Sequence, residues 1–334
     1  DPSEEHVHRL SRTAQGLGLR VYIERRAPRL SADVIPYPVV HTRMLSEREC
    51  IRATGHLIRE NGPAGMNGKC LQVLAGGIPV YIRAGAAQQF KITPEQLAAA
   101  ITEKTRLLVL NSPSNPTGMA YTRAELEALG EVIRQYPNIL VATDDMYEHI
   151  LWSDEPFCNI LMACPDLYDQ TMVLNGVSKA YSMTGWRIGY AGGPSDIIKA
   201  MKKIQSQSTS NPASISQAAA VAALNGPQDA IGTMLGAFRE RHDYVVGRLN
   251  GMKGIECLPT DGTFYVFPNI EGMIESTDGV SNDLEMGEYL IENAGVAVVP
   301  GSAFGLGGHM RISIATRMDA LESALDRIEK VINA

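Results

Sequence analysis

The sequence predicts an α/β protein in which a mostly parallel sheet carries helices on both faces, followed by a smaller α+β domain. From about residue 70, apolar runs of strand length alternate with helical patterns. Such alternation is typical of parallel sheets that are covered on both sides. After about residue 230, a long helical stretch precedes several short strand-like runs and further helices.

Composition and charge exclude several classes of protein. Of the 334 residues, 45% are hydrophobic and 20% are charged, which is ordinary for a soluble globular protein. The net charge of -7 argues against nucleic acid as the main partner. No apolar run is long enough to span a membrane, and the acidic start is unlike a signal peptide. The five cysteines are scattered and form no C-x-x-C pair, so we expect a cytoplasmic protein without a metal site.

Local signals mark the first elements of the regular part. The apolar run at residues 78–84 is strand-like, and Thr93 with Pro94 indicates a helix start. Residues 107–110 form a buried strand that runs into the polar turn "NSPSNPTG". A capping box of Thr122 and Glu125 predicts the start of the next helix.

Polar clusters follow three of the predicted strands. The first strand is followed by residues 111–115, the strand in "NILVATDDMYEHI" ends at Asp144, and the one in "QTMVLNGVSKAY" leads to Ser178 and Lys179. A fourth strand is predicted in "WRIGYAGG". Because ligands collect at the carboxyl ends of parallel strands, we expect these clusters to share one pocket.

The C-terminal part reads as a smaller domain. A helical stretch over residues 227–250 connects it to the sheet, and short strands are predicted in "GTFYVFP", "VAVVPG" and "MRISIA". Helices are predicted over residues 282–293 and from a cap at Thr316 and Asp319 to near the end. The predicted organisation is an N-terminal segment of unassigned role (1–66), a large domain (67–230) and a small domain (231–334).

The pocket would gather six kinds of functional group. Each residue alone has an ordinary explanation: most lysines are solvated, and Asn115 before a proline is a favoured turn residue. Together they match the needs of pyridoxal 5'-phosphate, which are an amine for its aldehyde, a carboxylate for its ring nitrogen, donors for its phenolic oxygen and a phosphate site. The groups come from Asn115, Asp144, Tyr147, Ser178, Lys179 and Arg187.

The motifs that carry these residues resemble a known family. "SNPTG", "DDMYE", "SKAYSMTGWRIGYAGG" and "MRISIA", in this order, are similar to the class I aminotransferases of pyridoxal-phosphate fold type I. The likeness is closest to the bacterial aspartate aminotransferase subgroup and covers about residues 68–334. It implies a homodimeric transaminase that exchanges an amino group between an amino acid, aspartate or another dicarboxylic one, and a 2-oxo acid by a ping-pong mechanism.

The resemblance also implies a role for each matched residue. Lys179 would form the Schiff base with the cofactor, and Asp144, three residues before the tyrosine, would pair with the ring nitrogen. The other implied roles are the phenolic oxygen of the ring for Tyr147 and Asn115, the phosphate for Ser178 and Arg187, the substrate α-carboxylate for Arg311, and closure over the substrate for residues 299–305.

Residues 1–66 do not match the family. There the family supplies a glycine pair that cups the phosphate, an aromatic that stacks on the ring and a tyrosine from the partner subunit, and the sequence shows no match for any of them. Gly77 aligns with a later strand turn rather than with the cup. Two alternatives to a transaminase therefore stay open: a non-catalytic or truncated relative, and a lyase or decarboxylase that uses the same cofactor.

Overall fold

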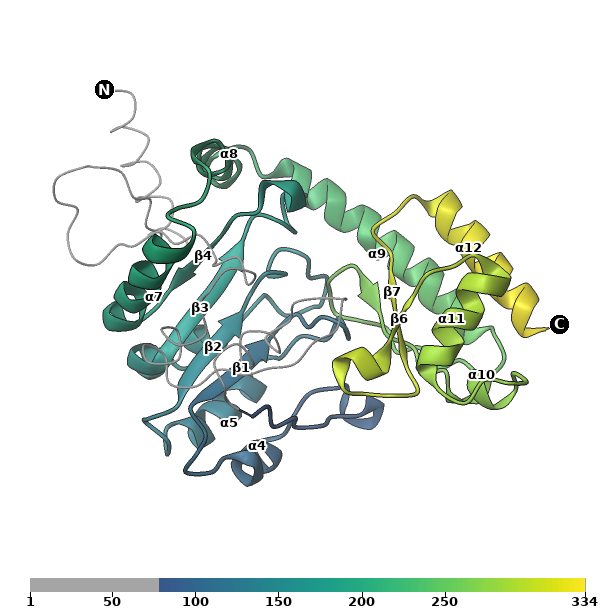
Figure 1. Ribbon diagram of the computed structural model, residues 1–334, viewed down its shortest axis with the longest axis horizontal. Coiled ribbons are helices and arrows are strands. Elements are labelled where there is room, and N and C mark those ends of the chain that lie inside the picture. The colour runs from purple at the N-terminus through teal and green to yellow at the C-terminus, as the bar shows by residue number, and fades with distance from the viewer. Residues whose placement is uncertain (1–77, 334) are drawn as a thin grey trace.

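The computed structural model of the chain describes residues 78–333. Within this range the strands form two sheets, which lie side by side in Figure 1. The first is four-stranded, in the order β1 (Leu107–Asn111), β2 (Leu140–Asp144), β3 (Thr171–Gly176) and β4 (Gly189–Gly192). The second is three-stranded, in the order β5 (Tyr265–Val266), β7 (Met310–Ser313) and β6 (Val299–Pro300).

The first sheet is mostly parallel, as the alternating pattern predicts. Strand β2 pairs in parallel with both β1 and β3, whereas β4 pairs with β3 in the antiparallel sense. In the parallel register Asn111 lies opposite Asp144. The carboxyl ends of β1, β2 and β3 therefore meet at one edge of the sheet.

Helices cover both faces of this sheet because successive side chains of a strand point to opposite sides. Val141 packs into a cluster that includes side chains from α4 (Pro94–Ala100), α5 (Arg123–Ile133) and α6 (Ile160–Ala163). Its neighbour Ala142 packs instead with Ile198 of α7 (Ser195–Ser208) on the other face. The sheet is thus buried on both sides, which explains its near-continuous apolar strands.

Two helices start where the capping patterns predict. The side chain of Thr93 accepts a hydrogen bond from Gln96 N, and the side chain of Gln96 accepts one from Thr93 N. Thr122 and Glu125 form the same reciprocal pair at the start of α5. Each cap satisfies backbone N–H groups that have no partner inside the helix, which contributes about 1 kcal/mol.

A 22-residue helix, α9 (Asp229–Asn250), leads from α8 (Ser214–Asn225) to the C-terminal part, as Figure 1 shows. Beyond it, the three-stranded sheet packs with helices from the same part of the chain. These helices are α10 (Glu271–Glu275), α11 (Asp283–Ala294) and α12 (Met318–Ile332). The helices expected over residues 227–250 and 282–293 are therefore confirmed to within about two residues.

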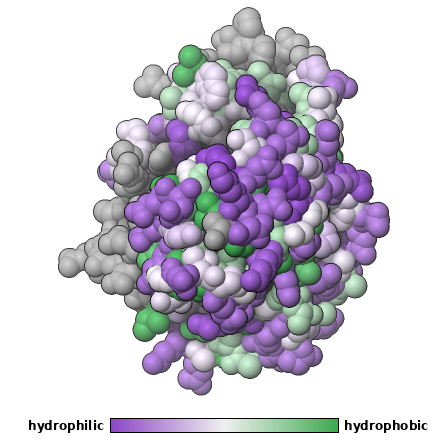
Figure 2. All heavy atoms as spheres, turned by 90° about the vertical axis from the view of Figure 1, so that its right-hand side faces the viewer, coloured by the Kyte–Doolittle hydropathy of each residue, from purple (hydrophilic) through white to green (hydrophobic). Residues whose placement is uncertain are grey.

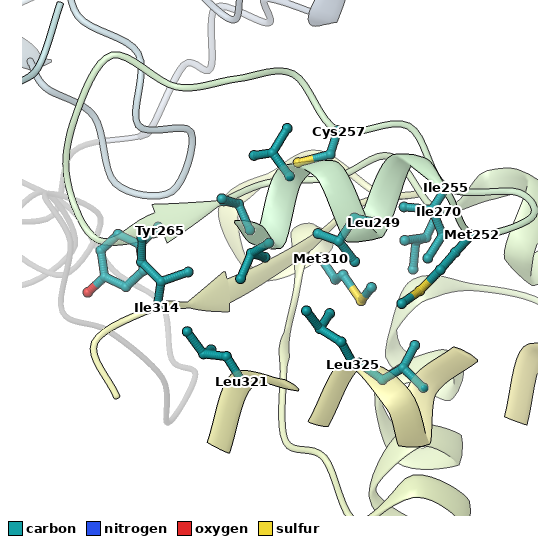
Figure 3. Packing of buried hydrophobic residues seen from close by; sticks show 14 of the residues in the cluster. Leu249, Met252, Ile255, Cys257, Tyr265, Ile270, Met310, Ile314, Leu321 and Leu325 are labelled. Carbon is teal, nitrogen blue, oxygen red and sulfur yellow. The ribbon is translucent and has the colours of Figure 1, made fainter. Parts of the chain in front are cut away.

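A large apolar cluster holds the C-terminal sheet in place. Leu249 of α9, Met310 of β7 and Leu325 of α12 are almost fully buried in it, and Figure 3 shows them facing one another. Burial of one such side chain contributes about 1.5–3 kcal/mol. Tyr147, from the segment after β2, belongs to the same cluster. Tyr265 lies at its edge, and its hydroxyl points away from the cluster (Figure 3).

The surface of the C-terminal part is mostly polar. Figure 2 shows the side of the molecule that carries α10, α11 and α12 in Figure 1, and hydrophilic residues predominate there with hydrophobic ones scattered between them. Among residues 78–333, every helix is either too short or too polar to cross a membrane.

Two local expectations are wrong. Residues 78–84 form no strand, and Ile78, Val80 and Tyr81 are each more than half exposed. Apolar content alone does not make a strand when no neighbouring strand pairs with it. The last helix is present at α12 (Met318–Ile332), but its expected cap is wrong: Arg317 stands at the N-cap position without a side-chain cap, and Asp319 pairs with Arg317.

Other expectations are not tested by the described residues. The N-terminal segment 1–66 and Gly77 lie outside them. The division of the regular part at residues 230 and 231 stays a prediction, although it coincides closely with the start of α9.

Gly295 ends α11 in the left-handed conformation, with φ +60° and its N–H bonded to Ile291 O. We expect Gly295→Ala to lower the free energy of unfolding by about 1 kcal/mol, because a side chain is strained there. Gly247 lies inside α9, and a Cβ added there would meet no atom of another segment within 4 Å. As the matched control, Gly247→Ala should raise that free energy by about 0.5–1 kcal/mol. Chemical denaturation measures both, and equal effects of the two variants would contradict the assignment.

Candidate active site

The carboxyl ends of β1 and β2 are tied together by one side chain. The Asn111 amide donates to the backbone oxygen of Asp144 at 2.9 Å, and its side-chain oxygen accepts from Asn115 N at 2.7 Å. The turn that carries Asn115 is therefore fixed against the strand end that carries Asp144. This confirms that the polar clusters after β1 and β2 share one edge of the sheet.

Lys179 follows β3 and lies at the same edge. Its Nζ is 5.8 Å from the ring centre of Tyr147 and 5.6 Å from that of Phe264. Burial is the largest cause that lowers the pKa of Lys179, followed by the charges of Arg187 and Arg311, while Asp144 opposes the shift. A lowered pKa makes the neutral amine more available, which a nucleophile or a proton acceptor requires.

Two adjacent carboxylates, Asp144 and Asp145, point in different directions. Asp144 is partly buried; burial raises its pKa, and the N–H of Met146 and the charge of Lys179 lower it in part. The carboxylate of Asp144 thus interacts with the charge of Lys179.

Asp145 is 1% exposed and points into the interior of the fold. Its carboxylate accepts hydrogen bonds from Thr143 Oγ1 at 2.6 Å and from Asn159 Nδ2 at 2.5 Å, and burial raises its pKa to about 7. Asp145 is therefore occupied by structural partners. The geometry supports Asp144 rather than Asp145 as the site residue.

Tyr147 forms a wall of the site together with Phe264 and with Tyr265 of β5. It is 4% exposed, and its hydroxyl lies 3.3 Å from that of Tyr265. Its ring packs edge-on against those of Phe264 and Tyr265. Burial raises the pKa of Tyr147 well above its usual value, so the phenol stays protonated and can donate a hydrogen bond.

Arg311 of β7 reaches across from the second sheet. Its Nη1 donates to the side-chain oxygen of Asn115 at 2.8 Å. The guanidinium lies 4.4 Å from the ring centre of Tyr265 and 5.0 Å from that of Phe304. Its Nε is buried, and among the described residues it has no hydrogen-bond partner. A buried donor without a partner is costly, so this geometry is suited to a carboxylate acceptor.

Ser178 and Arg187 flank Lys179 in the sequence and lie near it in the fold. The Ser178 hydroxyl lies 3.4 Å from Met146 Sδ. Arg187 is exposed, has a left-handed backbone with φ 52°, and donates from Nη1 to Thr184 O at 2.9 Å. Its charge lowers the pKa of Lys179, as that of Arg311 does. The phosphate roles of Ser178 and Arg187 stay predictions.

Three aromatic residues of the site carry roles that the motifs do not reveal. Phe264 and Tyr265 lie in "GTFYVFP", which predicts only a strand, and Phe304 lies in the loop expected to close over the substrate. No short pattern indicates that Tyr265 would lie between Tyr147 and Arg311. These contacts depend on pairing between β5 and β7, which only the folded chain provides.

The profile of one protein family matches most of the chain. The family described as "Aminotransferase class I and II" matches residues 71–328.

The chain belongs to this aminotransferase family.

Relatives within the family agree with the match. The chain is 55% identical over 266 residues to an "Aspartate/prephenate aminotransferase" of Nitrosomonas europaea, an alignment that covers 78% of this chain and 67% of the relative. It is 52% identical over 261 residues to the protein of the same name from Cereibacter sphaeroides, with 77% and 65% covered. The chain thus spans about two thirds of the length of these aminotransferases.

A solved aminotransferase structure shows the same fold. The aspartate aminotransferase from Rhizobium meliloti superimposes with a TM-score of 0.76 at 46% sequence identity, over 79% of this chain and 67% of that chain. The family and the α/β fold that the motifs indicate are therefore confirmed.

Replacement of the two adjacent carboxylates should separate function from stability. Asp144→Ala should lower the turnover rate by about 10²-fold or more, because a charge at the reacting centre is lost, and leave the melting temperature nearly unchanged. Asp145→Ala should instead lower the free energy of unfolding by about 3 kcal/mol, because Thr143 and Asn159 lose their acceptor. Steady-state kinetics and thermal unfolding of both variants test this; the reverse pattern would show that the two roles have been exchanged.

Proposed function

We propose that this chain is an aminotransferase that uses pyridoxal phosphate to move an amino group from aspartate, or a related dicarboxylic amino acid, to a 2-oxo acid. The observation that carries the proposal is that Lys179 and Arg311, from distant parts of the sequence, lie against one group of aromatic rings beside the strand end that carries Asp144. The names of the relatives, aspartate and aspartate/prephenate aminotransferase, support the substrate class. A homodimer in the cytoplasm is part of the same proposal.

The side chains present fit this cofactor. Asp144 is a carboxylate whose burial Lys179 compensates only in part, so it is suited to a further cation such as a protonated ring nitrogen. Arg187 and Ser178 supply a charge and a hydroxyl suited to a phosphate. Tyr147 and Asn115 supply groups that can hold a phenolic oxygen. When bound, pyridoxal phosphate supplies an aldehyde that takes up the amino group and a ring that accepts electrons from the substrate α-carbon.

The protein's own residues then perform three tasks. Arg311 holds the substrate α-carboxylate through its planar guanidinium, which Asn115 and two aromatic rings keep in orientation. Lys179, with its lowered pKa, moves the proton at the substrate α-carbon through Nζ. Asp144 keeps negative charge beside the ring. The apolar walls from Tyr147 and Phe264 limit the access of water and strengthen these interactions.

Lys179 is the decisive residue for the proposal. Incubation with pyridoxal phosphate and then borohydride should add the cofactor covalently to the peptide that contains Lys179, as mass spectrometry can detect. Lys179→Ala should lose this label and fall below a thousandth of the wild-type turnover, because the proton-transfer group is gone. Lys199→Ala changes an exposed lysine of α7 and serves as the matched control. A wild-type protein that stays unlabelled and inactive with aspartate and 2-oxoglutarate would refute the proposed function.

Arg311 should affect substrate binding rather than cofactor binding. We expect Arg311→Lys to raise KM about 10- to 100-fold for every amino-acid substrate, because lysine cannot form two parallel bonds with a carboxylate. The affinity for pyridoxal phosphate should stay within about twofold of wild type. Arg317→Lys, at an exposed ion pair with Asp319, is the matched control and should change neither value. Normal kinetics in Arg311→Lys would mean that the α-carboxylate is bound elsewhere.

A further inference from the structure

We propose that His242 of α9 is a positioning residue for the substrate anchor Arg311. It fixes the segment 260–265, and this segment supports two of the three groups against which Arg311 is oriented, Asn115 and Tyr265. The inference rests on the proposed function, because it assigns to His242 an effect on the binding of the substrate carboxylate. The side-chain contacts of His242 are to Thr260, Asp243 and Trp152, so it acts through this segment and not on the substrate.

The hydrogen bonds of His242 to Thr260 and Asp243 define its tautomer. It is 3% exposed, and its Nε2 accepts a hydrogen bond from the backbone N–H of Thr260 at 2.8 Å. Because Nε2 is the acceptor, the hydrogen of the neutral ring lies on Nδ1, which donates to Asp243 Oδ1 at 2.8 Å. The Nδ1–H form is therefore required for the bond to Thr260.

Thr260 is bound by side chains at both of its backbone groups. While His242 accepts from its N–H, Trp152 Nε1 donates to its carbonyl oxygen at 2.7 Å. The rings of Trp152 and His242 lie 5.2 Å apart and pack against each other. Thr260 lies outside any strand or helix, so these two side chains replace the backbone partners that secondary structure would supply.

The first residues of the segment 260–265 support the turn that carries Asn115. The N–H groups of Asp261 and Gly262 donate to Gly118 O at 3.1 and 2.9 Å. The Asp261 carboxylate accepts from Ala120 N at 2.8 Å. The approach is close: a Cβ on Gly118, which has φ +72°, would lie 2.6 Å from Thr260 Cβ. A shift of Thr260 would therefore move the turn, and with it the Asn115 oxygen that binds Arg311.

The other side of the segment supports the aromatic wall. Thr263 N donates to Ile150 O at 2.7 Å, and β5 follows directly. Tyr265 then lies beneath the guanidinium of Arg311, with 4.4 Å between the guanidinium carbon and the ring centre. Two of the three groups that orient Arg311, the Asn115 oxygen and the Tyr265 ring, are thus supported by the segment that His242 fixes, whereas Phe304 is not.

A purely structural role predicts a different result from this proposal. If His242 only fills space, any ring of similar size should serve. If its acceptor atom matters, glutamine should substitute, because its side-chain oxygen can reach the position of Nε2, and phenylalanine should not. Arg311 is expected to bind the substrate carboxylate equally well in the ground state and in the transition state. If Arg311 loses its orientation, KM should therefore rise while kcat stays nearly unchanged.

The kinetic test compares His242→Gln with His242→Phe in the cofactor-loaded enzyme, with aspartate and 2-oxoglutarate as substrates. We expect His242→Phe to raise KM for aspartate about tenfold with kcat within about threefold, and His242→Gln to stay within about twofold of wild type in both. A wild-type KM in His242→Phe would overturn the proposal, and so would equal defects in the two variants. Transaminase activity of the wild type is measured first, so failure of the proposed function is recognised separately.

Two further measurements keep the test decisive if His242→Phe does not fold. Trp152→Phe retains an aromatic ring but removes the hydrogen bond to Thr260 O, so it should raise KM for aspartate in the same way. An unchanged KM in this variant would contradict the proposal that fixing Thr260 orients Arg311. Nitrogen-15 NMR of the wild-type protein, with the His242 signals identified by their loss in His242→Gln, should show a protonated Nδ1 and an unprotonated Nε2. The opposite tautomer would overturn the proposal whatever the activity.

Discussion

The hydrogen bond between Arg311 and Asn115 joins two halves of the site that are built on different sheets. Asn115 belongs to the turn after β1, and Arg311 belongs to β7 in the C-terminal part, 196 residues further along the chain. Because the guanidinium also lies between Tyr265 and Phe304, it is held in one plane while its Nε stays without a partner among the described residues. A planar donor group with a buried, unpaired Nε–H is suited to a carboxylate ligand.

Charge balance around Lys179 follows from the same arrangement. Two arginines and burial lower the pKa of the amine, and only Asp144 opposes them. The neighbouring Asp145 does not contribute in the same way, since Thr143 and Asn159 bind its carboxylate inside the fold. Alternation of side chains at the end of β2 thus gives two adjacent carboxylates two different tasks: Asp144 interacts with the charge of the amine, and Asp145 anchors the strand end. Burial raises the pKa of Asp144 and lowers that of Lys179, so neither charge is fully balanced by the other. Shifted pKa values of this kind are typical of sites that bind a charged ligand.

The apolar core makes this geometry possible. Tyr147 belongs to the cluster that also contains Leu249 of α9 and Met310 of β7, so the segment after β2 packs on the C-terminal sheet as well as on its own. The segment 260–265 crosses between these parts, and its backbone is held by Trp152, Gly118 and His242 rather than by a regular ladder. Buried hydrogen-bond partners of this kind are costly to lose, which holds the segment in place although most of it lies outside regular secondary structure.

Local and periodic features were determined by the sequence itself. Alternating apolar runs gave the covered parallel sheet, capping pairs such as Thr122 and Glu125 gave helix starts, and the four ordered motifs gave the family and the candidate residues, since each of these signals lies within a few residues of chain. Only the tertiary structure decided that residues 78–84 form no strand, that Tyr265 and Phe304 enclose Arg311, and that His242 holds Thr260. These outcomes depend on which distant segments pack together. A strand needs a neighbour for its backbone bonds, and a side chain acquires its task from partners that the local sequence does not specify.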